Sequence, residues 1–233
     1  MVSIQEPSTE PQAQEQIPST TTKTQAEAEP SLSTTAPTAL TAVSDPILHL
    51  HKCIIRPYRP TDAAAIALAA NHPEIARFMR NTFPSPYTLR DAEYWLSIAS
   101  PLDFAVIARY DDDDGRGEVL AGAVGLRRLA DVESRTMEIG YWLGQAHWGR
   151  GIATEALRRF SLWAFENVPD VLRLEACVFG DNPRSAAVLR KVGYTFEGTR
   201  RKAVVKNGVV LDMMIYSLLR EEQHRLSESN VAC

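Results

Sequence analysis

One stretch near the middle of the chain limits the fold most: a strand runs through a glycine-containing loop directly into a helix. The apolar segment 141–144 ends the strand, glycines stand at positions 149 and 151, and apolar residues recur at helical spacing over 151–167. The first amides of a helix lack internal partners and carry roughly half a positive charge. Because glycine also lets a ligand approach the backbone closely, this loop predicts a phosphate site at the helix N-terminus.

Two familiar phosphate-binding loops do not fit this stretch. A P-loop ends in Gly-Lys followed by Ser or Thr, and this loop has no such ending. A dinucleotide-binding fingerprint needs a third glycine at the position of Thr154. For the loop taken alone, an ordinary glycine turn before a helix remains the alternative.

A second strand-to-helix junction lies further along the chain. The apolar-rich strand 173–178 leads into Asn182 and Pro183, which begin a helix over 183–192. Asparagine is a preferred N-cap, and proline suits the first helical position. Capping is part of the role of Asn182, and capping alone is the structural alternative to a ligand contact. The second junction strengthens the interpretation of a ligand site.

The other segments alternate between strand and helix patterns. Expected strands cover 47–58, 104–110, 118–129, 135–143, 173–178, 200–206 and 209–218, and expected helices cover 62–71, 73–80, 89–99, 151–167 and 183–192. Thr61 or Asp62 is expected to cap the first helix, and Thr88 the third. Asn207-Gly208 between two apolar runs predicts a hairpin. This order indicates a three-layer α+β or α/β domain with a mixed sheet.

Composition divides the chain into three parts. Residues 1–46 contain no aromatic residue and no glycine, and such a segment cannot bury enough apolar surface to offset its ordering entropy. We therefore expect a disordered tail at 1–46, a folded domain at 47–221 and a polar tail at 222–233. The four consecutive aspartates at 111–114 are expected to form a solvated loop rather than a metal site, because neighbouring residues in such a turn do not converge on one ion.

Charge and cysteine content exclude several classes of function. A formal net charge of -4 gives no reason to expect nucleic acid or an acidic membrane as a partner. The three cysteines are widely spaced and unpaired in pattern, which argues against a disulfide framework or zinc site. No secretory signal and no apolar run long enough to span a membrane is evident. The cytoplasm is the expected location, with the nucleus as the alternative.

Taken together, the segments 138–143, 148–156, 182–185 and 193–194 resemble the GNAT superfamily of acetyltransferases. More narrowly, they are similar to its RimJ/RimL-like branch, and the likeness covers about residues 51–220. The resemblance implies a mixed, mostly antiparallel, twisted sheet of about seven strands that splays between strands 4 and 5. It also implies acetyl-CoA as co-substrate, no metal, and an amine acceptor.

The resemblance assigns the coenzyme to the loop after the fourth strand and to the splayed strand end. The residues it implies for acetyl-CoA binding are Tyr141, Trp142, Leu143, Trp148, Gly149, Arg150, Gly151, Ile152, Ala153, Thr154, Asn182 and Ser185. A backbone amide near Trp142 or Leu143 is expected to polarise the thioester carbonyl.

The chain departs from the superfamily pattern at two positions. Trp148 stands where the superfamily usually has Arg or Gln, which is familiar in the RimJ/RimL-like branch. Leu189 stands where many relatives have a tyrosine that protonates the departing thiolate. Ser185 resembles the hydroxyl of this branch near the coenzyme arm and is our candidate substitute. The alternative is that Ser185 is an ordinary residue of the first helical turn.

The expected reaction is direct attack of a neutral amine on the acetyl thioester. We expect Glu138 to accept the amine proton, through water. A structural ion pair with Arg127 or Arg128 is the alternative for Glu138, and His147 is a weaker candidate base. The chain is thus predicted to be an N-acetyltransferase for a protein N-terminus or a small amine. A non-catalytic acyl-CoA-binding module and a simple phosphate-binding module are the competing interpretations.

Overall fold

The structure is a computed structural model that describes residues 44–110, 117–168, 170–224 and 226. The tail expected at 1–46 lies outside these residues except for its last three positions, and so does most of the expected tail at 222–233. The aspartate loop expected at 111–114 also lies outside them. No helix in the part that is described is long and apolar enough to cross a membrane.

Within the residues that the structure describes, one eight-stranded sheet organises the domain, with strand order β1-β2-β3-β4-β5-β6-β8-β7. The strands are β1 (Leu48–His49), β2 (Cys53–Pro57), β3 (Asp103–Arg109), β4 (Glu118–Arg128), β5 (Thr136–Leu143), β6 (Arg173–Phe179), β7 (Thr195–Lys206) and β8 (Val209–Leu219). Every neighbouring pair is antiparallel except β5 and β6, which are parallel. The expected α+β class with a mixed, mostly antiparallel sheet is confirmed.

The sheet has eight strands rather than seven because the first expected strand is a hairpin. The backbone N–H of Leu50 donates to the carbonyl of Cys53 at 2.9 Å, and this turn separates β1 from β2. The polar pair His51 and Lys52 is exposed at the turn. A polar interruption in an otherwise apolar run marks the reversal that we missed.

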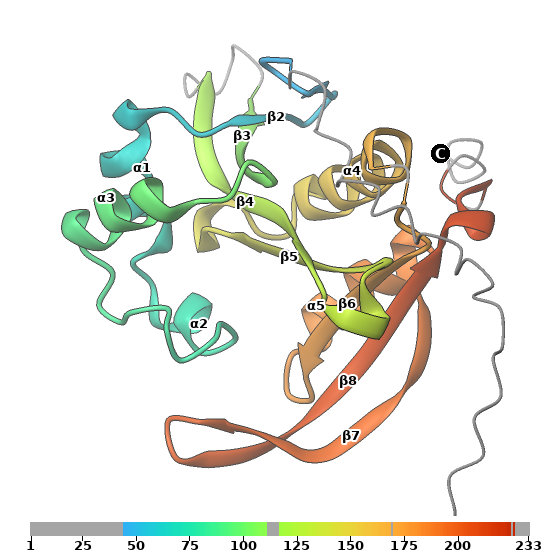
Figure 1. The fold of residues 1–233 in the computed structure, drawn as a ribbon. Coiled ribbons are helices and arrows are strands. Elements are labelled where there is room, and N and C mark those ends of the chain that lie inside the picture. The colour runs from blue at the N-terminus through green and yellow to red at the C-terminus, as the bar shows by residue number, and fades with distance from the viewer. Residues whose placement is uncertain (1–43, 111–116, 169, 225, 227–233) are drawn as a thin grey trace, which may run out of the picture. The chain divides into compact units, whose positions relative to one another are not determined.

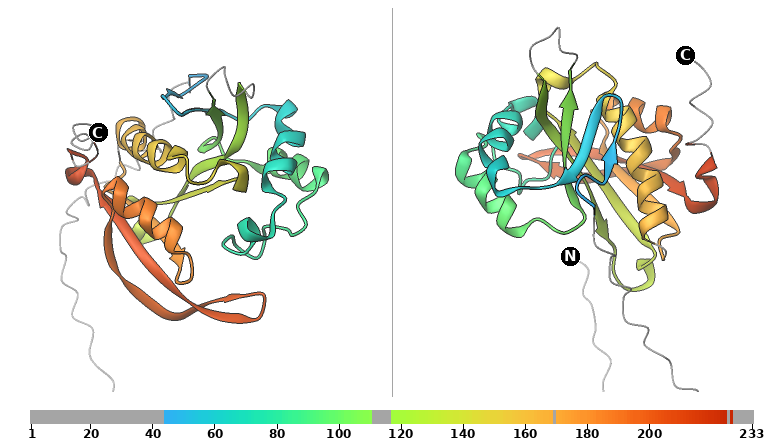
Figure 2. Two further views of the ribbon diagram at one scale, coloured as in Figure 1. Left: turned by 180° about the vertical axis from the view of Figure 1, so that it is seen from behind. Right: turned by 90° about the horizontal axis from the view of Figure 1, so that it is seen from above.

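Helices cover both faces of the sheet, and the two faces carry separate cores (Figure 2). The helices are α1 (Ala63–Ala70), α2 (Pro73–Ala76), α3 (Leu89–Ile98), α4 (Ile152–Asn167) and α5 (Pro183–Val192). Along β3, Phe104 and Val106 belong to the core beneath α4, whereas Ala105 and Ile107 belong to the core beneath α1 and α3. A strand that is buried on both faces has a continuous apolar sequence, and β3 has such a sequence.

The parallel pair β5–β6 holds together over only part of its length (Figure 1). Three residue pairs are in register, from Thr136–Arg173 to Glu138–Glu175, and β5 then continues to Leu143 paired with β4 but not with β6. The sheet therefore opens between these two strands, which are strands 4 and 5 of the expected seven. The predicted splay is confirmed, and it lies where both strand-to-helix junctions meet.

The Asn207-Gly208 hairpin forms as predicted, joining β7 to β8. Both residues have positive φ, 50° and 82°, as a two-residue turn of this kind requires. Strand β7 begins at Thr195 rather than at the expected position 200. Apart from Phe196, its first residues are not apolar, and they lie mostly exposed at the edge of the sheet, so they lack the apolar alternation that predicts a strand.

Helix boundaries agree with expectation to within one residue at α1, α3, α4 and α5, and differ at α2. Thr88 and Asp91 form the capping box of α3. The Asp62 side chain does not cap α1; it accepts hydrogen bonds from the Arg56 guanidinium at 2.8 Å and from the Arg59 N–H. The second helix ends at Ala76 rather than near position 80, because the chain continues as isolated turns.

An ion pair at the edge of the sheet gives the domain a predicted sensitivity to acid. Hydrogen bonds from the Arg173 guanidinium and then from the Ser217 hydroxyl lower the pKa of Glu197 to about 2. Because the folded pKa lies below the unfolded one, this stabilisation is present above the ordinary value of 4.5 and is lost as pH falls toward 2.

We therefore expect Glu197→Gln to lower the free energy of unfolding at pH 7, by less than about 1 kcal/mol because Glu197 is partly exposed. The difference from the wild type should shrink between pH 5 and pH 2. Urea titrations at several pH values measure it, with Glu93→Gln on α3 as the control. A difference that is constant with pH contradicts the assignment.

Candidate active site

The opening between β5 and β6 presents backbone groups without a strand partner. The N–H of Gly144 donates to the carbonyl of Ala121 at 2.7 Å, so this residue points toward β4. Residues along a strand alternate in the side to which their backbone groups point. The N–H groups of Tyr141 and Leu143 therefore point away from β4, into the opening. Of the two amides expected to polarise a carbonyl, the geometry favours that of Leu143 over that of Trp142.

The loop before α4 has the geometry of an anion-binding turn. Gly149 and Gly151 have φ of 74° and 80°, in the left-handed region, and Gly151 is the N-cap of α4. Left-handed backbone is costly for residues with a β-carbon, which explains both glycines. The amides of the first helical turn, from Ile152 to Thr154, have no earlier helical carbonyl to bind. They are available to an anion at this end of α4.

Lys52 lies beside this loop and was missed by sequence reasoning. Its ammonium donates to the Arg150 carbonyl at 3.1 Å, and its N–H donates to the Glu155 carboxylate at 2.7 Å. The lysine comes from the β1–β2 turn, far from the loop in sequence. Because the sequence showed no separate hairpin there, no local signal could have brought the lysine to the loop.

A small cavity connects the strand opening with the start of α4. Its lining residues are Val106, Ala123, Val124, Tyr141, Trp142, Leu143, Ala153, Ala156 and Leu157. The helix contributes the small side chains of Ala153 and Ala156 on the side that faces β5. The cavity joins several of the residues that the sequence assigned to the coenzyme.

On the other side of the opening, α5 reaches back to β5. The Asn182 side chain accepts a hydrogen bond from the Ser185 N–H at 3.1 Å, so the predicted N-cap is confirmed. The hydroxyls of Tyr141 and Ser185 lie 2.8 Å apart. Burial raises the pKa of Tyr141 to about 12, so its hydroxyl stays protonated at neutral pH.

A second contact spans the same opening closer to the loop. The Arg184 guanidinium lies 4.8 Å from the centre of the Trp148 ring, in a cation–π arrangement. The Trp148 indole N–H in turn donates to the Leu143 carbonyl at 2.8 Å. Trp148 thus ties the loop to the end of β5, and Arg184 ties α5 to the loop.

Leu189 is fully buried in the core beneath α5. The position at which many relatives carry a tyrosine is therefore a packing position in this chain. The hydroxyl groups beside the opening come from Tyr141 and Ser185 instead.

Glu138 forms the ion pair that was considered as its alternative role. Its carboxylate accepts hydrogen bonds from Arg127 and from Arg80, the latter at 2.6 Å. Arg128 bonds the Ser134 carbonyl instead. Burial alone raises the pKa of Glu138, but the two guanidinium groups outweigh it and lower that pKa overall. Glu138 is thus an ionised carboxylate, and a weak base toward a free ammonium group.

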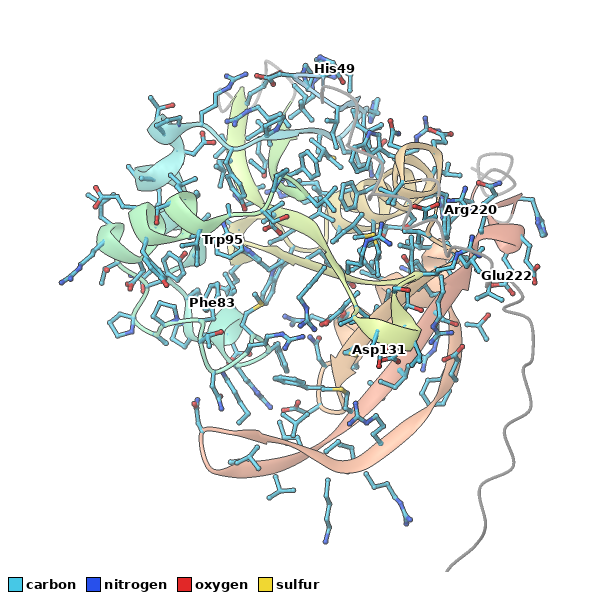
Figure 3. The ribbon with its side chains drawn as sticks, in the orientation of Figure 1. His49, Phe83, Trp95, Asp131, Arg220 and Glu222 are labelled. Atoms are coloured by element: carbon cyan, nitrogen blue, oxygen red, sulfur yellow. The ribbon has the colours of Figure 1, made fainter. Side chains whose placement is uncertain are left out.

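Aromatic side chains adjoin the same face of β5. Glu138, Gly140 and Trp142 share this face by strand alternation. The Phe83 ring contacts the Trp142 ring edge-on, with 6.2 Å between centroids. Phe83 and Trp95 lie on the side of the sheet that carries α1 and α3 (Figure 3). The loop between α2 and α3 therefore adjoins this face of β5, which we call the acceptor side.

His147 is buried, and its ring nitrogen contacts the Tyr110 hydroxyl. This setting accounts for the residue structurally. Within the described ranges, no three side chains of the metal-ligating types converge on one point.

Comparison with known proteins agrees with this geometry. Residues 52–195 match the family model described as "Acetyltransferase (GNAT) domain". The Bacillus subtilis protein named "Putative ribosomal N-acetyltransferase YdaF" is 37% identical over 44% of this chain and 55% of its own length. The "Uncharacterized N-acetyltransferase YoaA" of the same species is 28% identical over 76% of this chain and 99% of its own.

A solved structure extends the comparison to the whole fold. The structure titled "Mycobacterium smegmatis RimJ in complex with CoA-disulfide" superimposes with a TM-score of 0.62 at 24% identity, over 76% of this chain and 89% of the other. The fold and the family match together define an acetyltransferase domain. This chain belongs to the GNAT acetyltransferase family.

Proposed function

We propose that this chain transfers the acetyl group of acetyl-CoA to a primary amine, preferentially the α-amine of a protein N-terminus. The observation that carries the proposal is the sheet opening at β5, where the end of the strand and the first turns of α4 line one small cavity. Two relatives support a protein acceptor by their names, "Putative ribosomal N-acetyltransferase YdaF" and "Ribosomal-protein-serine acetyltransferase".

The residues around the opening fit acetyl-CoA in three groups. Gly149, Arg150, Gly151 and the amides of Ile152, Ala153 and Thr154 hold the pyrophosphate, with Lys52 beside them. Tyr141, Trp142 and Leu143 hold the pantetheine arm through their backbone and the adjoining cavity. Trp148, Asn182 and Ser185 fix the positions of the loop and of α5 around it.

Bound acetyl-CoA supplies an activated acyl carbon that a neutral amine attacks. The Leu143 N–H points into the opening, where it stabilises negative charge on a carbonyl oxygen. The Ser185 hydroxyl donates its proton to the departing thiolate. The Tyr141 hydroxyl, which is protonated and lies 2.8 Å from Ser185 Oγ, donates to that oxygen in turn.

The ordinary acidities of the two amine classes favour an α-amine over a lysine side chain as acceptor. An α-amine of pKa ~8 is about one tenth neutral at pH 7, which costs roughly 1.4 kcal/mol. Neutralising a lysine of pKa ~10.4 at pH 7 costs about 4.6 kcal/mol by the same reasoning. Glu138, whose pKa is lowered, cannot supply that larger difference by deprotonating an ammonium group. It is suited to accept the proton through water once the C–N bond has formed, when the nitrogen is far more acidic.

The test is a screen of N-terminal peptides and small amines with acetyl-CoA. The release of free thiol and the mass of the product are measured for each acceptor. We expect thiol release that depends on the amine, with one acetyl group on the peptide α-amine. Coenzyme A binding without thiol release for any acceptor would instead support the non-catalytic module, which the burial of Leu189 makes a specific competitor.

Gly151→Ala tests the assignment of the phosphate site. The β-carbon of an alanine there would lie 2.8 Å from the Lys52 ammonium, and the alanine would have to adopt a backbone φ of 80°. We expect coenzyme A to bind about tenfold more weakly, because the backbone approach at the helix N-terminus is obstructed. Calorimetry with coenzyme A measures the affinity.

Gly208→Ala is the matched control, because its φ of 82° imposes the same backbone strain and nothing lies within 4 Å of the added carbon. Both variants should lose about 1–2 kcal/mol of stability. Only the first should lose affinity, and equal affinity in the two variants contradicts the site.

A further inference from the structure

Two arginine side chains bind a single carboxylate on the acceptor side of the opening, and a lysine contacts the backbone of one of these arginines. Arg80 and Arg127 both donate to Glu138. The Glu138 side chain is 18% exposed, whereas those of Arg80 and Arg127 are 64% and 62% exposed. The two guanidinium groups therefore share one anion and remain accessible to a second.

Lys206 is the third cation, and it is buried at 7% exposure. Its ammonium donates to the Arg80 carbonyl at 3.4 Å. Among the described residues no carboxylate lies within ion-pair distance of it. Burial lowers the pKa of Lys206. A buried ammonium without an anion is costly, and the cost falls when a negative charge binds next to it.

Arg80 connects this lysine to the carboxylate. Its carbonyl accepts from Lys206, and its side chain donates to Glu138. The next residue, Asn81, donates to the Val205 carbonyl at 3.1 Å. These contacts dock the tip of the β7–β8 hairpin against the chain after α2 (Figure 1). Arg80 and Lys206 are thus held together where the chain between α2 and α3 meets the β7–β8 hairpin.

Nearby carboxylates do not neutralise the group. Glu175 and Glu197 pair with Arg173, and Asp181 pairs with Arg77 at 2.8 Å. Within the cluster itself, the three cations Arg80, Arg127 and Lys206 stand against the single carboxylate of Glu138.

We propose that the cluster of Arg80, Arg127 and Lys206 selects acceptors that carry a carboxylate close to the reacting amine. This inference rests on the proposed function and names its substrate class: an N-terminus followed directly by an acidic residue, or a free amino acid with the same groups. The amine lies toward the opening, and the carboxylate pairs with the cations.

Binding of short peptides to the full chain in the presence of coenzyme A tests the proposal without requiring turnover. We compare Ala-Asp-Ala-Ala with Ala-Asn-Ala-Ala, which differ by one charge at nearly constant shape. The acidic peptide should bind at least tenfold more tightly at low salt, and the ratio should fall as salt screens the charges. Free aspartate forms a second arm: affinity equal to that of the acidic peptide indicates a small-molecule acceptor, and weaker affinity indicates a peptide.

Lys206→Gln and Arg127→Gln should each reduce the tenfold ratio to threefold or less. Arg201→Gln removes the same charge from an exposed position of β7 and should leave the ratio unchanged. Thermal melting confirms that each variant is folded, and Arg127, being exposed, provides the test if Lys206→Gln does not fold. Equal binding of the two peptides by the wild type overturns the proposal, as does a ratio that survives both substitutions. Either result leaves amine acetylation itself intact, since that is measured separately by thiol release.

Discussion

Replacing Arg220 with alanine is expected to lower the free energy of unfolding by about 3 kcal/mol. Its guanidinium donates to the carbonyls of Phe165, Val168 and Val171, at 2.6, 2.8 and 2.7 Å. The first two close the C-terminal end of α4, where helical carbonyls have no partners of their own. Arg220 follows directly after β8, near Glu222 (Figure 3), so the contact fastens the end of the sheet to α4. Urea unfolding of the variant and the wild type measures the loss.

Arg220→Lys separates the charge from the geometry of these contacts. A lysine keeps the positive charge at the helix C-terminus, but its single ammonium cannot reach three carbonyls in the fork that guanidinium provides. We expect it to recover less than half of the lost stability. Full recovery indicates that charge alone accounts for the effect, and a loss below about 0.5 kcal/mol in the alanine variant contradicts the capping role.

Local patterns in the sequence predicted the features of this fold that depend on local physics. The Asn207-Gly208 turn, the Asn182 cap and the glycine loop each follow from a few adjacent residues whose backbone preferences leave little choice. The splay between β5 and β6 was predicted by family resemblance, since nothing in the strand composition requires it. The short polar turn at His51 and Lys52 was missed because two polar residues do not outweigh the apolar residues around them.

The residues that complete the site were not predictable in the same way. Lys52 contacts a residue 98 positions away, and Arg80 contacts Glu138 and Lys206, which lie 58 and 126 positions away. Arg80 follows a helix that proved shorter than expected, and Lys206 lies at the tip of a hairpin whose docking partner has no sequence signal. Their roles depend on how the chain folds back on itself, and a single sequence carries no record of that without comparison among homologues.

Replacing Glu138 with glutamine is expected to lower kcat by about a hundredfold, the usual effect of losing a positioned proton acceptor. The affinity for acetyl-CoA should stay within twofold, because Glu138 faces the acceptor side and not the loop of α4. Glu175→Gln is the matched control. Glu175 lies directly opposite Glu138 in the parallel register and is likewise paired with an arginine, Arg173. We expect it to lower kcat by less than threefold.

The effect of Glu138→Gln on acceptor binding distinguishes a proton acceptor from a residue that only holds the site together. Removing the carboxylate leaves Arg80 and Arg127 without their shared anion, so an acidic peptide should bind at least as tightly as to the wild type. Because the pKa of Glu138 is lowered, its own titration should not appear in the wild-type rate profile above pH 5, where activity rises with the neutral fraction of the amine. A fall in peptide affinity that matches the fall in kcat would assign Glu138 a structural role. A loss in kcat alone, with affinity kept or increased, is the result that a proton acceptor requires.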